Sequence, residues 1–201
     1  MSSTTILELK PVKSTLDRHR NIAGALLFVG VAQYIVALIL SEALYPRYSI
    51  SDNFISDLGV GPAALLHNSS VALLGLMVIL VAYFVHRTFR KPLVTLIFAL
   101  AGAGASGVGF FPETFGVLHT LASFVAFSFG GLSSIVAYKL EKPPLTYFSI
   151  AMGAISLVAL VLFIAGYNLG LGPGGMERMI VFPIVLWAIG FGGCLMGSQK
   201  E

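Results

Sequence analysis

The stretch PLTYFSIAMGAISLVALVLFIAGY, residues 144–167, contains no charged side chain and is long enough to cross a lipid bilayer as one helix. Five further apolar runs resemble it, and together they take up most of the 201 residues. The six runs are Asn21–Leu44, Leu66–Val85, Pro92–Phe110, Phe115–Tyr138, Pro144–Tyr167 and Met176–Met196. Hydrophobic residues make up 57% of the chain and charged residues only 10%, whereas a water-soluble domain of this length needs far more surface charge. The sequence therefore predicts an all-α, polytopic membrane protein built as a six-helix transmembrane bundle.

The chain divides into a short polar start, one membrane domain and a short polar end. We expect residues 1–20 to form a cytoplasmic N-terminal arm, in which Pro11 breaks any long helix. Residues 21–197 are expected to form the six-span membrane domain, and residues 198–201 a cytoplasmic tail. This division leaves no room for a separate soluble domain.

Lysine and arginine alternate along the chain between loops that hold several of them and loops that hold almost none. The N-terminal arm, the loops after the second and fourth runs and the C-terminal tail contain ten of the 12, while the other three loops contain only Arg47 and Arg178. Basic loops favour the cytoplasmic side of a membrane. We therefore predict a multi-pass protein of the plasma (cell) membrane whose N and C termini are both cytoplasmic.

Charge and cysteine content exclude several classes of function. The net charge is only +3, and the basic residues lie at the ends of runs with no basic patch interleaved with aromatic residues, so nucleic acid is not expected as a partner. The single cysteine, Cys194, excludes an internal disulfide and a cysteine-based metal site. The middles of the runs contain no acidic or basic residue, which disfavours a channel or an ion-coupled carrier.

Small residues recur at helical spacing in several runs, most clearly in AGAGASG, residues 101–107, and again at Gly193 and Gly197. In lipid, small residues allow two helix backbones to approach closely, and this contact holds a bundle together. We expect these faces to pack against one another inside the bundle. A homo-oligomer formed through the same faces is the alternative.

The longest loop contains SDNFISDLG, residues 51–59, which has the pattern of a short helix. Ser51 or Asp52 can cap its start, Gly59 can end it, and its apolar positions share one face. We therefore expect a short extracytoplasmic helix or cap in this loop, with its apolar side against protein or lipid.

The uncommon polar residues of the chain concentrate at the predicted outer side. We expect them to form an outward-facing polar pocket that binds a lipid or another small ligand. The predicted ligand-binding residues are Asn53, Ser56, Asp57, His67, Glu113, His119 and Arg178. Membrane lipids are therefore the expected partners.

Arg178 lies near the start of the last run, where the helix dipole disfavours a cation. A buried or half-buried arginine there needs a partner, and Asp57 and Glu113 are the candidates, because Glu177 is too close in sequence to face the same way. The pair would pin the loops together. The alternative is a clamp for a lipid phosphate or a substrate carboxylate, since arginine suits both groups.

An enzyme is the alternative class of function, and the sequence does not decide between an enzyme and a binding protein. In a membrane-embedded lipid hydrolase or transferase, His119 would be the general base and Asp57 or Glu113 would orient it. His67, His119 and Asp57 could instead hold zinc as a cofactor, although their spacing is not that of a specific metal motif. A non-catalytic subunit of a membrane complex is a third possibility.

The strings NFISDLG (residues 53–59) and FPE (residues 111–113), followed by Gly116 and His119, resemble an uncharacterised prokaryotic family of six-span membrane proteins, common in archaea. This family is the domain of unknown function numbered nine-nine-eight, and the resemblance implies the six-span fold over essentially the whole chain. More distantly, the same strings are similar to the FRAG/DRAM/Sfk group, which implies a connection with lipids. Ceramidase-like hydrolases are disfavoured, because Ser123 stands where their motif has its second histidine.

Overall fold

The computed structural model describes residues 5–197, with side chains described from residue 15 onward, so the predicted tail at 198–201 lies outside the described residues. The six long helices are α1 (Thr5–Leu44), α2 (Ala64–Phe89), α3 (Pro92–Phe110), α4 (Val117–Val136), α5 (Leu145–Ile164) and α6 (Gly172–Gly197). Three short 3₁₀ helices connect them: η1 (Ser56–Gly59), η2 (Glu113–Phe115) and η3 (Ala137–Lys139). All six long helices are long and apolar enough to span a bilayer. The prediction of an all-α, six-span membrane bundle is therefore confirmed.

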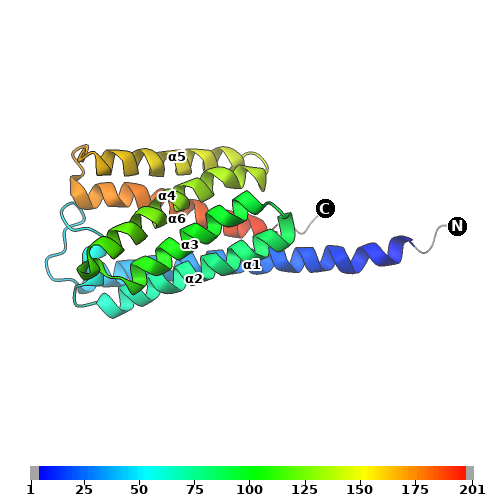
Figure 1. Ribbon diagram of the computed structural model, residues 1–201, viewed down its shortest axis with the longest axis horizontal. Coiled ribbons are helices and arrows are strands. Elements are labelled where there is room, and N and C mark those ends of the chain that lie inside the picture. The colour runs from blue at the N-terminus through cyan, green and yellow to red at the C-terminus, as the bar shows by residue number, and fades with distance from the viewer. Residues whose placement is uncertain (1–4, 198–201) are drawn as a thin grey trace.

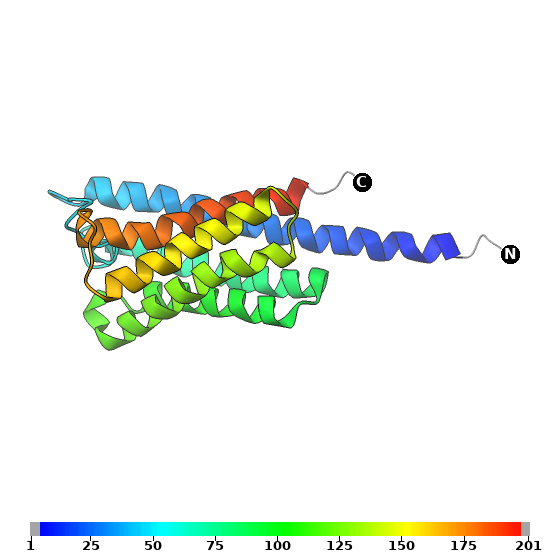
Figure 2. The ribbon, with the colours of Figure 1, turned by 90° about the horizontal axis from the view of Figure 1, so that it is seen from above.

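The six helices form a closed ring of neighbours. Each of α1 to α5 packs against the helix that follows it, and α6 returns to pack against α1 (Figure 1; Figure 2). Trp187 and Phe191 of α6 stack in the interior, and both contact Phe98 of α3. This aromatic core joins opposite sides of the ring.

Helix α1 is longer than the sequence predicted. It begins at Thr5 and includes Pro11, and it projects beyond the bundle at the end where the C terminus lies (Figure 1). The prediction that Pro11 prevents a long helix is therefore wrong. A proline in the second turn removes a single backbone hydrogen bond, whereas the leucine, glutamate and lysine residues just before it favour helix.

Small residues bring neighbouring helices into direct backbone contact, as the sequence predicted. A Cβ atom added at Gly75 of α2 would collide with Ser106 and Gly102 of α3, and one added at Gly24 of α1 would collide with the carbonyl of Gly192 in α6. By contrast, a Cβ atom at Gly193 would meet nothing within 4 Å. Most of the small-residue faces are thus occupied inside the bundle, and a homo-oligomer through the open glycines of α6 stays a prediction.

The loop of residues 45–63 packs on the start of α6. The backbone N–H of Gly174 donates to the carbonyl of Ser51, and the Ser51 hydroxyl donates to the carbonyl of Leu171. Gly174 allows this approach, because a Cβ atom there would collide with the carbonyl of Asn53. The helix predicted over 51–59 is only the four-residue η1, since the residues before it are held in turns by side-chain hydrogen bonds.

Candidate functional site

The first, third and fifth loops between the long helices meet at one end of the bundle, which we call the odd-loop end. They are residues 45–63, 111–116 and 165–171, seen at the left in Figure 1. Two adjoining cavities lie just inside this end. Both are bounded by Ser56 of η1, by His119, Ser123 and Phe127 of α4 and by Glu177 of α6. These five side chains form the shared wall.

The first cavity, which we call the inner cavity, has a volume of about 120 Å³ and lies between α1, α2, α3, α4 and α6. Tyr34 and His67 add polar groups to those of the shared wall, while the rest of its lining is apolar. The inner cavity is therefore polar at the odd-loop end and apolar towards the middle of the bundle.

The second cavity, which we call the lateral cavity, has a volume of about 210 Å³ and reaches the outer surface of α4 and α5. Glu113 and Thr120 add polar groups at its rim. Its other side is a wall of apolar side chains: Phe54, Phe124, Phe127, Leu160, Phe163 and Ile164. Phe124 and Ile164 are 50% and 64% exposed on the surface that would face lipid. The lateral cavity thus joins a polar end to an apolar, membrane-facing side.

His119 is held in one orientation by its own helix and by the loop before it. Its Nδ1 atom lies 2.8 Å from the carbonyl oxygen of Phe111, an acceptor, so this nitrogen carries the proton. The Nε2 atom is then an acceptor, and the hydroxyl of Ser123 lies 3.3 Å from it. The imidazole therefore presents a fixed lone pair to both cavities.

Glu177 is almost completely buried, with 6% of its surface exposed, and it points into the shared wall. One carboxylate oxygen accepts a hydrogen bond from the backbone N–H of Ile55. This is the only hydrogen bond that the described residues make to the carboxylate. Its remaining acceptor capacity is available at the cavities.

Asp57 and Glu113 bring two carboxyl groups together from different loops. Partial burial and then the neighbouring Asp57 carboxylate raise the pKa of Glu113 above its ordinary value. Asp57 itself accepts hydrogen bonds from the Asn53 side chain and from the backbone N–H of Phe54. Asp57 therefore organises the loop and adds negative charge behind Glu113 at the rim of the lateral cavity.

Arg178 lies outside both cavities and fastens the first loop to α6. One terminal nitrogen of its guanidinium group donates to Glu42 at 2.6 Å and to the Tyr48 hydroxyl at 2.6 Å. The other lies within hydrogen-bond distance of the carbonyls of Ile50, Asn53 and Gly174. Its acidic partner is Glu42, so the expectation that Asp57 or Glu113 pairs with Arg178 is wrong. The α6 helix also begins four residues earlier than predicted, at Gly172, which places Arg178 in the second turn.

Tyr48 extends the Arg178 contact to the carbonyl of Phe54. Its hydroxyl accepts from the guanidinium and donates to that carbonyl at 2.9 Å, which requires the hydroxyl to carry its proton. Burial raises the pKa of Tyr48 to about 12, so the proton is retained at neutral pH. Together Arg178, Glu42 and Tyr48 form what we call the loop clamp.

The structure therefore divides the seven predicted ligand-binding residues into two groups. Four line a cavity: Ser56 and His119 line both, His67 lines the inner one and Glu113 lines the lateral one. Asn53, Asp57 and Arg178 instead hold the first loop in place through hydrogen bonds. The binding role of the first group stays a prediction that its position supports.

The residues predicted to hold zinc do not lie close together. Among the residues that the structure describes, no three His, Cys, Asp or Glu side chains are close enough together to hold a metal ion. His67, His119 and Asp57 therefore do not form the three-ligand set that a protein zinc site needs.

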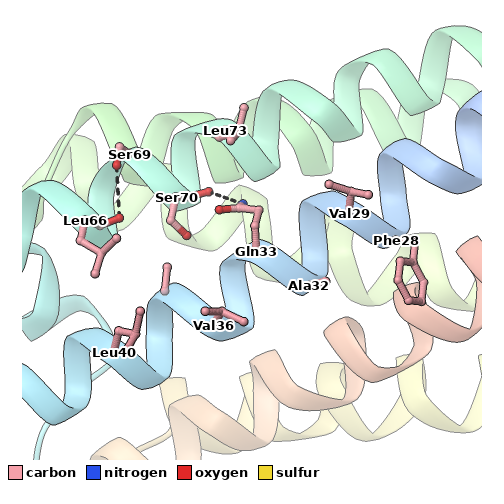
Figure 3. Close-up of a pocket in the computed structure, with 11 residues that line it drawn as sticks. Phe28, Val29, Ala32, Gln33, Val36, Leu40, Leu66, Ser69, Ser70 and Leu73 are labelled. Atoms are coloured by element: carbon pink, nitrogen blue, oxygen red, sulfur yellow. Dashed lines mark hydrogen bonds between the residues drawn. The ribbon is translucent and has the colours of Figure 1, made fainter.

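A larger concavity is a groove between α1 and α2, with a volume of about 590 Å³ (Figure 3). Its lining is almost entirely apolar, and Figure 3 shows the amide of Gln33 turned to the neighbouring helix. The Gln33 Nε2 atom donates to the carbonyl of Ser70 at 3.0 Å and to that of Gly30 at 2.9 Å. Because its amide donors are used inside the bundle and no charged group lines it, we place the candidate site in the two cavities instead.

Sequence reasoning missed several side chains of the site. Glu177 was considered only as a partner for Arg178, and Glu42, Tyr34 and Ser123 were not assigned to the site. One signal was available, because adjacent helical residues are about 100° apart. If Arg178 faces the first loop, Glu177 faces another side of α6, and an ionisable side chain in a span is expected to face the bundle interior and not the lipid.

The family model described as "Protein of unknown function (DUF998)" matches residues 28–193, which is more than half of the chain. No curated protein and no solved structure matches the chain. The likeness to the FRAG/DRAM/Sfk group therefore rests on the short motifs alone. The family match runs from α1 to α6 and includes every residue of the two cavities. The protein is thus a six-span membrane protein of the DUF998 family, a family whose function is not known.

Proposed function

We propose that this protein binds a membrane lipid, or a small ligand with an apolar chain, through the lateral and inner cavities. The observation that carries the proposal is the two-part lining of the lateral cavity. Polar groups from η1, η2, α4 and α6 gather at its odd-loop end, and aromatic and aliphatic side chains of α4 and α5 lead from there to the membrane-facing surface. An amphipathic molecule in the outer leaflet has the same division.

The size of the cavities indicates that they would enclose only part of the ligand. Pockets that hold a whole drug-sized ligand measure roughly 300–1,000 Å³, and the lateral cavity is smaller at about 210 Å³. The polar head and the first part of a chain would lie inside, and the rest of the chain would lie along α4 and α5 in the bilayer. The ligand would enter the lateral cavity sideways from the bilayer, because Phe124 and Ile164 are exposed at the opening of this cavity.

The proposal places the odd-loop end outside the cell membrane and both termini in the cytoplasm. The distribution of lysine and arginine supports this orientation, since the loops at the opposite end are the basic ones. A fluorescent protein that folds only in the cytoplasm, fused after residue 201, should fluoresce. The same reporter inserted in the exposed stretch 168–171 should stay dark, and the reverse pattern would overturn the orientation.

Filling the shared wall should prevent ligand retention. Ser123→Leu places a larger side chain between the two cavities, and we expect lipid adducts in native mass spectra of the purified protein to fall at least fivefold. Ser69→Leu is the matched control, because Ser69 lines the α1–α2 groove and its hydroxyl bonds only within its own helix. Equal retention by both variants, with both folded, would remove the two cavities from consideration.

An acyl-transfer enzyme is the second candidate, and one observation favours it. The Ser123 hydroxyl faces the acceptor nitrogen of an imidazole whose other nitrogen is held by a backbone carbonyl, which is the relation of a nucleophile to its general base. A fluorophosphonate probe should then label the native protein, and neither Ser123→Ala nor His119→Gln should be labelled. Absence of labelling in the native protein would leave binding as the function.

A further inference from the structure

We infer that the polar end of the ligand is a protonated amine, so that the site selects an amphiphile with an ammonium head over one with an anionic head. This inference rests on the proposed function and names the chemistry of the ligand. It follows from two features of the cavities: their charge, and the hydrogen-bonding groups that their walls leave unused.

The charge of the site is negative. Glu113 and Glu177 line the lateral cavity, and the carboxyl group of Asp57 is near enough to both to act on them electrostatically. None of the described lysine and arginine side chains lines either cavity. Arg178, which follows Glu177 in sequence and acts on it electrostatically, is paired with Glu42 and directed to the first loop. A cationic head would therefore relieve repulsion among three carboxyl groups, whereas an anionic head would add to it.

The unused hydrogen-bonding groups point in the same direction. His67 is 3% exposed and lines the inner cavity, yet its Nδ1 atom has no hydrogen-bond partner. Glu177 is 6% exposed, and its carboxylate accepts only one hydrogen bond from the described residues. A buried polar atom without a partner destabilises a protein. Such atoms are therefore expected where a ligand completes them.

An ammonium group matches this set. It carries up to three N–H donors and no acceptor, and the cavity walls offer carboxylate oxygens and the His67 imidazole. A quaternary ammonium carries the same charge but no N–H donor, so the structure also predicts discrimination between these two cations. The phenylalanines of α4 and α5 would then hold the chain of the same molecule.

The test uses the full-length protein in nanodiscs made from equal amounts of phosphatidylethanolamine, phosphatidylcholine and phosphatidylglycerol. Lipid that stays bound after transfer to detergent is identified by native mass spectrometry. We expect phosphatidylethanolamine to exceed each of the other two at least tenfold. Retention of lipid without this preference, or with a preference for phosphatidylglycerol, would overturn the inference and leave the proposed function standing. Retention of no lipid at all would instead count against the proposed function.

Displacement of the bound lipid by single-chain compounds distinguishes recognition of the head group from recognition of the alkyl chain. Dodecylamine should displace the bound lipid, and dodecanol and dodecyltrimethylammonium should not. Equal displacement by dodecanol would contradict the inference. Displacement by ethylamine alone would keep the amine chemistry and assign the site to a small free amine.

Two substitutions connect the preference with the carboxyl groups. Glu113→Gln and Glu177→Gln keep the shape of each side chain and remove its charge, and we expect the phosphatidylethanolamine preference to fall below threefold. Asp52→Asn is the matched control, because it removes an acidic charge from the same end of the bundle at a side chain that bonds only Ser49. Thermal unfolding of each variant shows whether it is folded. Folded glutamine variants that keep the full preference would overturn the inference.

Discussion

Arg178→Met is expected to detach the first loop from α6 and to lower the free energy of unfolding by about 3–5 kcal/mol, the usual effect of removing one partner of a buried ion pair. Arg178 is 5% exposed and its guanidinium joins the end of α1, the first loop and α6. The substitution removes every one of these bonds. It also leaves the Glu42 carboxylate, whose side chain is 19% exposed, without its counter-charge.

The measurement is thermal unfolding of the purified protein in nanodiscs, combined with hydrogen exchange of residues 45–63. We expect a lower midpoint and faster exchange in this loop, with little change in the loop after α2. Arg178→Lys should give an intermediate result, because lysine keeps the charge but has three donors from one nitrogen in place of the guanidinium fork. Arg47→Met is the control, since Arg47 is exposed in the same loop.

A second substitution distinguishes the loop clamp from a simple loss of side-chain packing. Glu42→Gln removes the charge that Arg178→Met leaves unpaired, so the double variant should be less destabilised than the sum of the two single effects. Additive effects, or an Arg178→Met protein as stable as the native one, would show that the ion pair does not hold the first loop.

The bundle was predictable from sequence because a bilayer imposes a length on every spanning helix. Hydropathy therefore places the spans, and the two ends of Pro92–Phe110 agree with the structure. The start of α6 was mispredicted at a tertiary contact. Residues 172–175 are three glycines and a proline, the composition of a loop, yet α6 begins there and packs on the first loop, whose carbonyls lie where a Cβ atom of Gly174 would be.

The site was only partly predictable, for a different reason. Polar residues in three loops indicated the end of the bundle at which the two cavities lie, since a polar side chain in or near lipid requires a partner or a function. The pairing among them depends on which way each helix is turned, and hydropathy carries little information about that. Arg178 faces the first loop and meets Glu42 at the end of α1, a residue that sequence reasoning did not assign to the site. Glu177, one position earlier, faces the cavities.

The contact between α2 and α3 provides the second large expected effect, because there the two backbones touch through glycine. Gly75→Ala would place a methyl group within 3.0 Å of Ser106 and of the Gly102 carbonyl, and both are fixed parts of α3. Overpacking of this kind costs about 1–3 kcal/mol, since neither helix can move without loosening its other contacts. We expect a lower thermal midpoint in nanodiscs for this variant.

Gly193→Ala is the matched control, because the same methyl group on α6 would meet nothing within 4 Å. Alanine favours helix over glycine by about 1 kcal/mol, so this variant should be as stable as the native protein or more stable. The difference between the two alanine variants then measures the backbone contact alone, since the change in helix propensity is common to both. Equal midpoints for the two variants would mean that α2 and α3 do not approach each other through Gly75.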